Sequence, residues 1–171
     1  MLLVSRKIDT SLGSLQAAVT EKGLCRIFFS GEDADRWNLW FDRHFSRIPE
    51  SGDHPLIDEL ESQLTEYLAG ESRVFSAPLD LRGTEFQTTV WTRLLEIPYG
   101  ATVTYGDLAF EMGISGGSRA IGGAVGNNPV PILVPCHRVL GASGQLVGFA
   151  GGIDLKERLL ELEGARIPFG S

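Results

Sequence analysis

Residues 118–126 carry so few side-chain atoms that they restrict the possible folds of this chain more than any other segment. Five of the eight residues from Arg119 to Gly126 are glycine or alanine, and Ser118 just before them is a typical helix cap. We expect a helix here, although each glycine disfavours an isolated helix by up to about 1 kcal/mol relative to alanine. A close approach to another backbone, or to a ligand, is needed to offset that cost.

A second short helix is expected just before the glycine-rich one. Thr104 and Asp107 have the spacing of a capping box, and the helical pattern continues to Met112, before the loop 113–117. Two short helices joined by a glycine-containing turn are typical of a helix-turn-helix variant, although many helix pairs are merely structural. The second helix has few groups that could read base edges, so on DNA it would bind by shape and backbone contacts.

The remaining pattern predicts an α/β N-terminal half and a mainly helical C-terminal half. Residues 1–30 are expected to form a meander of short strands. Helices are then expected at 33–45, 55–68, 84–94 and 153–163. Residues 71–83 contain Pro78 and Gly83 and favour an extended connection. We therefore expect an α/β domain of antiparallel strands and helices over residues 1–80, and a mainly α domain with the helix-turn-helix variant over residues 81–171.

The charge of the chain is unevenly distributed. The net charge of −7 is unusual for a DNA-binding protein, since such domains are usually basic. Residues 1–80 contribute 14 acidic and 8 basic side chains, whereas no carboxylate occurs between Glu111 and Asp154, where Arg119 and Arg138 lie. Salt screens exposed charges beyond about 8 Å, so a local cationic face could still bind phosphate. A buried core region would explain the acid-free stretch equally well.

The composition is that of a soluble globular protein, with 43% hydrophobic and 22% charged residues. No apolar run approaches the roughly 18 residues of a membrane helix, and the N-terminal apolar stretch is too short for a signal peptide. Cys25, His44 and His54 show none of the spacings of a zinc site. We expect a cytoplasmic protein with no membrane partner, no metal and no cofactor.

Cys136 is the candidate reactive residue. The apolar run 131–134 is expected to be a buried strand that delivers Cys136 to a turn at Pro135, among loops rich in asparagine and glycine. A lone cysteine is by default a small buried hydrophobe. Nucleophilic chemistry requires the thiolate, of which only a few per cent exists at pH 7 for a free thiol. His137 could act as the base, more plausibly through a water or a turn than by direct contact.

A base needs an orienting group, and the C-terminal helix offers one. Asp154 and Glu157 have capping-box spacing at its start, and Leu155, Leu159 and Leu162 are expected on its apolar face. Glu163 follows Leu159 by four residues and projects toward the same side, where an unpaired carboxylate would be costly. We expect His137 to be its partner; the alternative is that Glu163 lies in solvent at the helix end.

At these residues the sequence resembles the O6-alkylguanine-DNA alkyltransferases, from about Gly83 to Gly164. The resemblance is carried by seven short motifs in order, Phe86-Gln87-Thr88-Thr89-Val90-Trp91, Ile97-Pro98-Tyr99-Gly100, Thr104-Tyr105-Gly106, Arg119-Ala120-Ile121-Gly122, Asn127-Asn128-Pro129, Pro135-Cys136-His137-Arg138-Val139 and Gly151-Gly152-Ile153. The strand-then-helix order of the N-terminal part is similar to the ribonuclease-H-like domain of that family.

The resemblance implies a role for each site residue. Cys136 would take the alkyl group from O6 of guanine, and O4-alkylthymine would be a second substrate. His137 would act through a water as base, Glu163 would hold His137, and Asn128 would brace the chain near the thiol. The protein would be a methylated-DNA–protein-cysteine methyltransferase that reacts once.

The resemblance also implies the DNA contacts. The small-residue helix, with Ala120 and Gly123, would lie in the minor groove, and Arg119 would fill the gap left by the flipped base. Tyr105 would help to rotate the nucleotide out of the duplex and would protonate the leaving guanine. The substrate pocket would be formed by Tyr105, Val139, Phe149 and Ala150. The partner would be double-stranded DNA containing O6-alkylguanine, bound by a cytoplasmic, nucleoid-associated protein. We expect a monomer in solution and leave open cooperative binding on DNA.

Two departures and two alternatives accompany this interpretation. Many relatives have Tyr-Ser or Tyr-Gly where this chain has Phe149-Ala150, which leaves the range of alkyl groups open, and the lone Cys25 argues against the zinc that some relatives carry. A lesion-binding protein without transfer activity is one alternative, although Cys136 speaks against it. A thiol hydrolase using Cys136, His137 and Glu163 is the other, and it leaves Arg119 unexplained.

Overall fold

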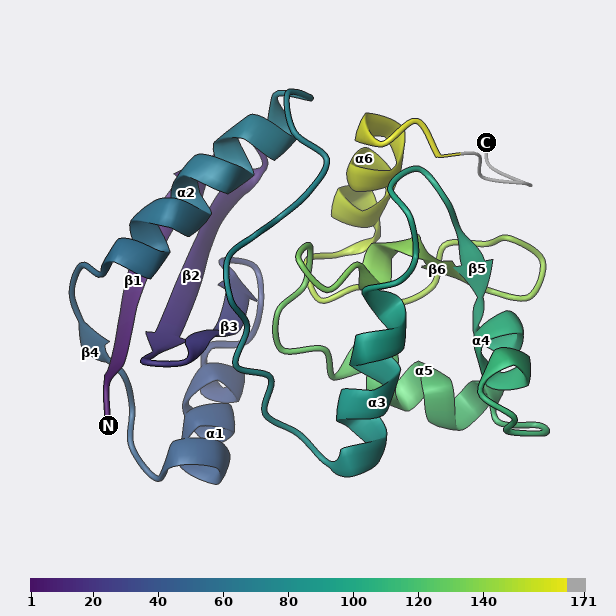
Figure 1. Cartoon of the computed structure of the whole chain (residues 1–171), viewed down its shortest axis with the longest axis horizontal. Coiled ribbons are helices and arrows are strands. Elements are labelled where there is room, and N and C mark those ends of the chain that lie inside the picture. Colours follow the sequence, from purple (N-terminus) through teal and green to yellow (C-terminus); the bar gives the residue numbers. More distant parts are fainter. Residues whose placement is uncertain (166–171) are drawn as a thin grey trace. The chain divides into compact units, whose positions relative to one another are not determined.

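The computed structural model describes residues 1–165 of the chain. The chain divides into two compact units, Met1–Arg82 and Gly83–Ser171, which are described separately (Figure 1). The last six residues of the expected second domain, 166–171, lie outside the described residues.

The N-terminal unit is built on a four-stranded sheet. The strands are β1 (Leu3–Thr10), β2 (Gly13–Thr20), β3 (Gly23–Phe29) and β4 (Glu50–Ser51), in the order β3-β2-β1-β4. The first three form an antiparallel meander, as the sequence predicts, and the short β4 adds in parallel to β1.

Two helices cover opposite faces of this sheet. Helix α1 (Ala34–Phe45) packs Phe41 against Leu3, and α2 (Pro55–Leu68) lies along the strands on the side to which Arg6 points. Leu3 and Arg6 lie an odd number of residues apart on β1, and successive side chains of a strand alternate between faces. The α/β architecture expected for this half is therefore present (Figure 1).

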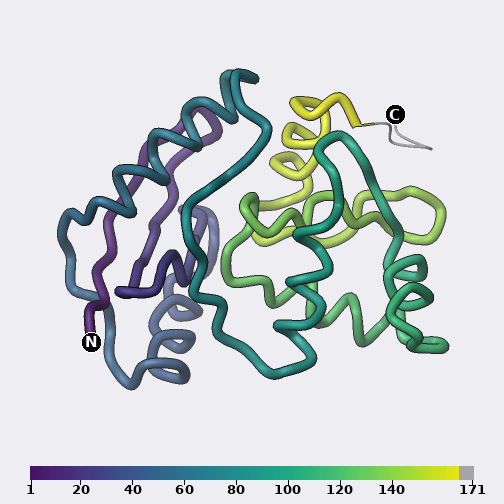
Figure 2. The backbone as a smooth tube through the Cα atoms, viewed as in Figure 1, coloured from purple at the N-terminus to yellow at the C-terminus, as the bar shows by residue number. Residues whose placement is uncertain are grey.

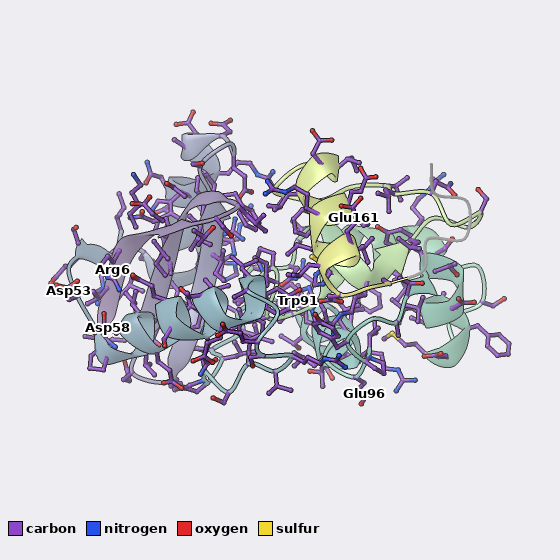
Figure 3. All side chains as sticks on the ribbon, turned by 90° about the horizontal axis from the view of Figure 1, so that it is seen from above. Arg6, Asp53, Asp58, Trp91, Glu96 and Glu161 are labelled. Carbon is purple, nitrogen blue, oxygen red and sulfur yellow. The ribbon has the colours of Figure 1, made fainter. Side chains whose placement is uncertain are left out.

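Arg6 joins three parts of the N-terminal unit. Its guanidinium forms ion pairs with Asp53, which follows β4, and with Asp58 and Glu61 of α2 (Figure 3). Asp53 and Asp58 are exposed and Glu61 is half-buried, so we assign the pairs a modest stabilising effect. Helix α2 begins at Pro55 as the sequence predicts, with His54 as its cap, and Ile57 is buried from its first turn.

The C-terminal unit is mainly helical. Its helices are α3 (Glu85–Leu94), α4 (Tyr105–Glu111), α5 (Ser118–Gly126) and α6 (Ile153–Leu162), with one 3-10 turn, η1 (Cys136–Arg138). Two short parallel strands, β5 (Val103–Thr104) and β6 (Val139–Leu140), pair with each other. The backbone trace follows the unit from teal α3 to yellow α6 (Figure 2).

Helix α5 is anchored to α3 by a buried indole. Trp91 of α3 donates from Nε1 to the carbonyl of Ala124 at 2.8 Å, and Trp91 is 1% exposed. Helix α4 packs on α5 to form the pair expected from the sequence, and it opens with the predicted capping box of Thr104 and Asp107. The α4–α5 pair is therefore fixed to the rest of the unit through its second helix.

Two of the expected helix caps are wrong. The cap of α5 is Gly117, and Ser118 is already the first helical residue. The cap of α6 is Gly152, with φ of +94°, so Asp154 lies inside the first turn and forms no capping box with Glu157. In both cases a glycine occupies the entry to the helix, and the carboxylate of Asp154 acts only through the helix dipole.

Among residues 1–165 no helix is long and apolar enough to cross a membrane.

Candidate active site

Cys136 lies in a buried turn and not after a strand. Residues 131–134 are buried as expected, but they form a turn closed by a bridge between Pro131 and Val134, with Ile132 at φ of +76°. The strand predicted for this run is therefore wrong; its apolar character reflects burial and not extension. The 3-10 turn η1 then begins at Cys136 itself.

The thiol of Cys136 is enclosed, with 7% of the residue exposed. Burial raises its pKa to about 11, while a hydrogen bond from Asn128 and the charge of Lys156 act in the opposite direction. Asn128 is itself fixed, because its Nδ2 donates to the Val134 carbonyl at 2.8 Å and its Oδ1 accepts from the Val130 amide at 3.0 Å. The thiol therefore needs help to ionise, and Asn128 is held where it can stabilise the thiolate.

His137 and Glu163 meet inside the unit. Nε2 of His137 lies 2.8 Å from Oε2 of Glu163, and both side chains are fully buried. A carboxylate only accepts hydrogen bonds, so Nε2 carries the proton and Nδ1 is left as an acceptor. Nδ1 is buried and has no hydrogen-bond partner among residues 1–165. Burial lowers the pKa of His137, against the raising effect of Glu163, and so favours the neutral ring that a base requires.

Glu163 also binds Arg138 through both of its oxygens. Arg138 donates from Nε to Oε1 and from Nη2 to Oε2, each at 2.8 Å, and its Nη1 donates to the Ile97 carbonyl at 2.7 Å. The Gly100 amide approaches Oε1 at 3.4 Å. In this bidentate pair the guanidinium compensates the charge of the buried carboxylate.

The sequence reasoning did not identify Lys156. This lysine is completely buried, and its Nζ donates to the carbonyls of Val139 (2.7 Å), Val147 (2.9 Å) and Gly148 (3.4 Å). Burial lowers its pKa to about 8, and the charge of Cys136 opposes that shift. Lys156 precedes Glu163 by seven residues, so the two lie on the same face of the helix. This spacing is the sequence signal that could have indicated the burial of Lys156.

The buried face of α6 consequently differs from the expected stripe. It consists of Lys156, Leu159, Leu160 and Glu163, whereas Leu155 and Leu162 are only half-buried. Glu161 points away from this face into solvent (Figure 3).

The residues expected in the substrate pocket lie on three segments. Tyr105, the first residue of α4, is half-buried and donates from its hydroxyl to the Val147 carbonyl at 3.3 Å. Val139 is buried directly after η1, while Phe149 is half-buried and Ala150 is exposed in the loop before α6. Burial, together with the charge of Cys136, raises the pKa of Tyr105, so its hydroxyl keeps its proton.

The exposed face of α5 is almost bare. Arg119, Ala120 and Gly123 are exposed, and a Cβ atom added at Gly123 would meet nothing within 4 Å. At Gly122 the nearest atoms, from Tyr105, would be at an ordinary contact distance of 3.8 Å. Packing within the protein therefore does not require glycine at either position.

Among residues 1–165 no group of three or more His, Cys, Asp or Glu could hold a metal ion.

Two family models match the chain. The one described as 6-O-methylguanine DNA methyltransferase, DNA binding domain, matches residues 85–165. The one described as 6-O-methylguanine DNA methyltransferase, ribonuclease-like domain, matches residues 3–81. Together they account for both compact units.

Individual relatives carry a related name. A methylated-DNA–protein-cysteine methyltransferase of Mycobacterium tuberculosis is 57% identical over 106 residues, which span 62% of this chain and 64% of that protein. A protein of the same name from Methanosarcina acetivorans is 53% identical over 159 residues, 92% of this chain and 96% of that protein. The crystal structure of M. tuberculosis OGT in complex with DNA is similar with a TM-score of 0.80 and 42% identity, covering 97% of this chain and 96% of that one.

We predict that Glu163→Gln destabilises the protein by about 2–4 kcal/mol, because it leaves the guanidinium of Arg138 buried without its counter-charge. The matched control is Glu161→Gln on the exposed face of the same helix, expected within about 0.5 kcal/mol of the wild type. Urea unfolding followed by circular dichroism measures both. Equal stability of the two variants would contradict the role assigned to the Arg138–Glu163 pair.

Proposed function

Since this chain belongs to the 6-O-methylguanine DNA methyltransferase family, we propose that it repairs DNA by transferring the alkyl group of O6-alkylguanine to its own Cys136. The observation that carries the proposal is the bond between Glu163 and His137 beside the enclosed thiol. It leaves one ring nitrogen of His137 as a base and fixes the orientation of the ring. O4-alkylthymine presents the same reacting bond and is proposed as a second substrate.

The transfer is an in-line displacement. The thiol proton of Cys136 passes to Nδ1 of His137, directly or through a water, and the sulfur attacks the alkyl carbon. The carbon–O6 bond breaks, its electron pair remains on the guanine, and the guanine takes up a proton for which the Tyr105 hydroxyl is the proposed donor. The thiolate formed in this step is stabilised by Asn128 and by the cation of Lys156. The product is a thioether that water does not reverse, so each molecule reacts once.

Base flipping is part of the proposal, because the alkyl group of a paired guanine lies inside the stack. The bare face of α5 supports binding in the minor groove, which admits a helix only if the helix is thin or the groove is opened. Arg119, exposed at the start of that face, is proposed to occupy the space that the flipped base leaves.

The acceptor is tested by intact mass spectrometry after incubation with a duplex containing O6-methylguanine. We expect one methyl group per molecule, located on Cys136 by peptide mapping, and no further loss of lesion after all protein has reacted. Cys136→Ser should leave the lesion intact. Cys25→Ser is the control and should react fully, because Cys25 is buried in the other unit and its pKa is raised to about 12. Repeated turnover would indicate a hydrolase, and binding without transfer a lesion sensor.

The base is tested by the pH dependence of the transfer rate on the same duplex. A thiol with a pKa of about 11 that ionises without assistance reacts about tenfold faster with each pH unit up to that value. With neutral His137 as base, the rate is instead flat above the pKa of His137, which burial holds below its usual value, and falls on acidification below it. It declines again only above about pH 8, where Lys156 loses the charge that stabilises the thiolate. A log-linear rise from pH 6.5 to pH 9 would refute the role of His137.

The contribution of Arg119 is tested by comparing two substrates. Arg119→Ala should slow repair of the lesion in duplex DNA by about tenfold, equivalent to ~1.4 kcal/mol, and leave reaction with the free base O6-benzylguanine unchanged if wild type accepts it. Arg158→Ala, which removes an exposed arginine from α6, is the control and should affect neither rate. An equal loss of rate on both substrates would exclude a role of Arg119 that is confined to duplex DNA with a flipped base.

A further inference from the structure

One buried cation of the N-terminal unit has no part in the site around Cys136. Arg26, in the middle of β3, is 7% exposed, and its Nε is buried without a hydrogen-bond partner among residues 1–165. Burial lowers its pKa, since removal from water disfavours the charged form. Buried polar groups are normally satisfied, so an arginine in this condition calls for an explanation.

Arg26 is held by aromatic rings instead of by an anion. Its guanidinium lies 5.2 Å from the ring centre of Trp40 on α1. Trp40 also packs on His44 at 4.6 Å and on Phe45 at 5.9 Å, and Arg82 lies over Phe45 at 4.8 Å. We call these five residues the arginine–aromatic cluster. Cation–π attraction orients a guanidinium without occupying its N–H donors.

The carboxylates near the cluster form no ion pair with Arg26 within the described part of the chain. Asp80 is engaged with Arg82, at 3.0 Å to Nε and 2.9 Å to Nη2. Glu32 accepts from the Phe29 amide at 2.8 Å, and its charge acts on Arg26 without forming an ion pair. Nε of Arg26 is enclosed, so a ligand would be bound by the two terminal nitrogens of the guanidinium.

Further cations surround the cluster in a unit that is acidic as a whole. Residues 1–80 have a net charge of −6, from 14 acidic and 8 basic side chains. Arg36 and Arg43 nevertheless project from α1, where the charge of Arg36 acts on Arg26 and the charge of Arg43 acts on His44. Like charges gathered in this way repel one another, and an anion among them would remove that repulsion.

We propose that the arginine–aromatic cluster binds a phosphate group, with Arg26 as its fixed centre and the exposed Arg36 and Arg43 as its rim. The planar fork of a guanidinium matches two phosphate oxygens, and a ring beneath it fixes the direction in which the fork points. The phosphate belongs either to the backbone of a nucleic acid or to a free phosphate compound. The site uses no residue of the alkyl-transfer site and does not depend on the function proposed for Cys136.

Calorimetric titration of the full chain with inorganic pyrophosphate at constant ionic strength tests the site. We expect one molecule bound per chain and an affinity reduced by about tenfold or more in Arg26→Met, which keeps the apolar stem and removes the guanidinium. Lys7→Gln removes an exposed cation that pairs with Asp9, outside the cluster, and should bind as the wild type does. Wild type that does not bind, or Arg26→Met that binds equally well, would overturn the proposal.

Arg43→Gln keeps the test decisive if Arg26→Met does not fold. Arg43 is exposed, so its replacement should leave the circular dichroism spectrum unchanged, and we expect it to weaken pyrophosphate binding severalfold. An unchanged affinity in Arg43→Gln, measured on folded protein, counts against the site.

A competition experiment identifies the source of the phosphate. If undamaged duplex DNA displaces pyrophosphate, and Arg43→Gln lowers the salt dependence of duplex binding by about one unit of slope, the ligand is the nucleic-acid backbone. If duplex DNA leaves pyrophosphate in place, the ligand is a free phosphate compound. Both results support a phosphate site and differ in its occupant.

Discussion

The hydrogen bonds and the ion pair of the buried Glu163 carboxylate are the interactions on which the site around Cys136 depends. This carboxylate is fully buried, yet it accepts hydrogen bonds from His137, from two nitrogens of Arg138 and, at a longer distance, from the Gly100 amide. A buried charge is stable only when it is compensated in this way. The same bonds join the end of α6 to η1 and to the loop after α3, so the segments that position the thiol are held by one group.

The enclosure of Cys136 makes its reactivity conditional. Burial raises the pKa of the thiol to about 11, so the thiol is largely protonated at pH 7. In the transfer that we propose, His137, oriented by Glu163, would supply the base, and Asn128 and Lys156 would stabilise the resulting anion. Because the proposed product is a thioether, such restraint would keep a misdirected reaction from consuming the thiol.

Two buried cations in this protein illustrate opposite situations. Lys156 is surrounded by three carbonyl oxygens from β6 and the following loop, which satisfy its donors and hold that loop against α6. Arg26 lies against Trp40, without a hydrogen-bond partner for its Nε among residues 1–165. The donors of Lys156 are satisfied within the fold, whereas the proposed phosphate would supply an anion to the guanidinium of Arg26. An acidic chain can therefore present local cationic sites without a basic overall charge.

The sequence by itself determined the elements whose signals are local. The meander of residues 1–30, the start of α2 at Pro55 and the capping box at Thr104 follow from turn chemistry and periodicity, and each lies where it was expected. The glycine-rich α5 could be recognised in the same way, because its composition leaves a bare face wherever the helix packs. The seven short motifs between Phe86 and Ile153 carried the resemblance to the family, and both family models support it.

Only the tertiary structure decided how the apolar segments are used. The run 131–134 is a buried turn and not a strand, because burial from several sides gives the same apolar composition to both. The sequence analysis singled out neither Lys156 nor Arg26, since the groups that surround them come from residues distant in the sequence. Periodicity shows which residues share a face, but partners such as the Val139 carbonyl and the Trp40 ring are set by non-local packing, and those partners determine whether a charge can be buried.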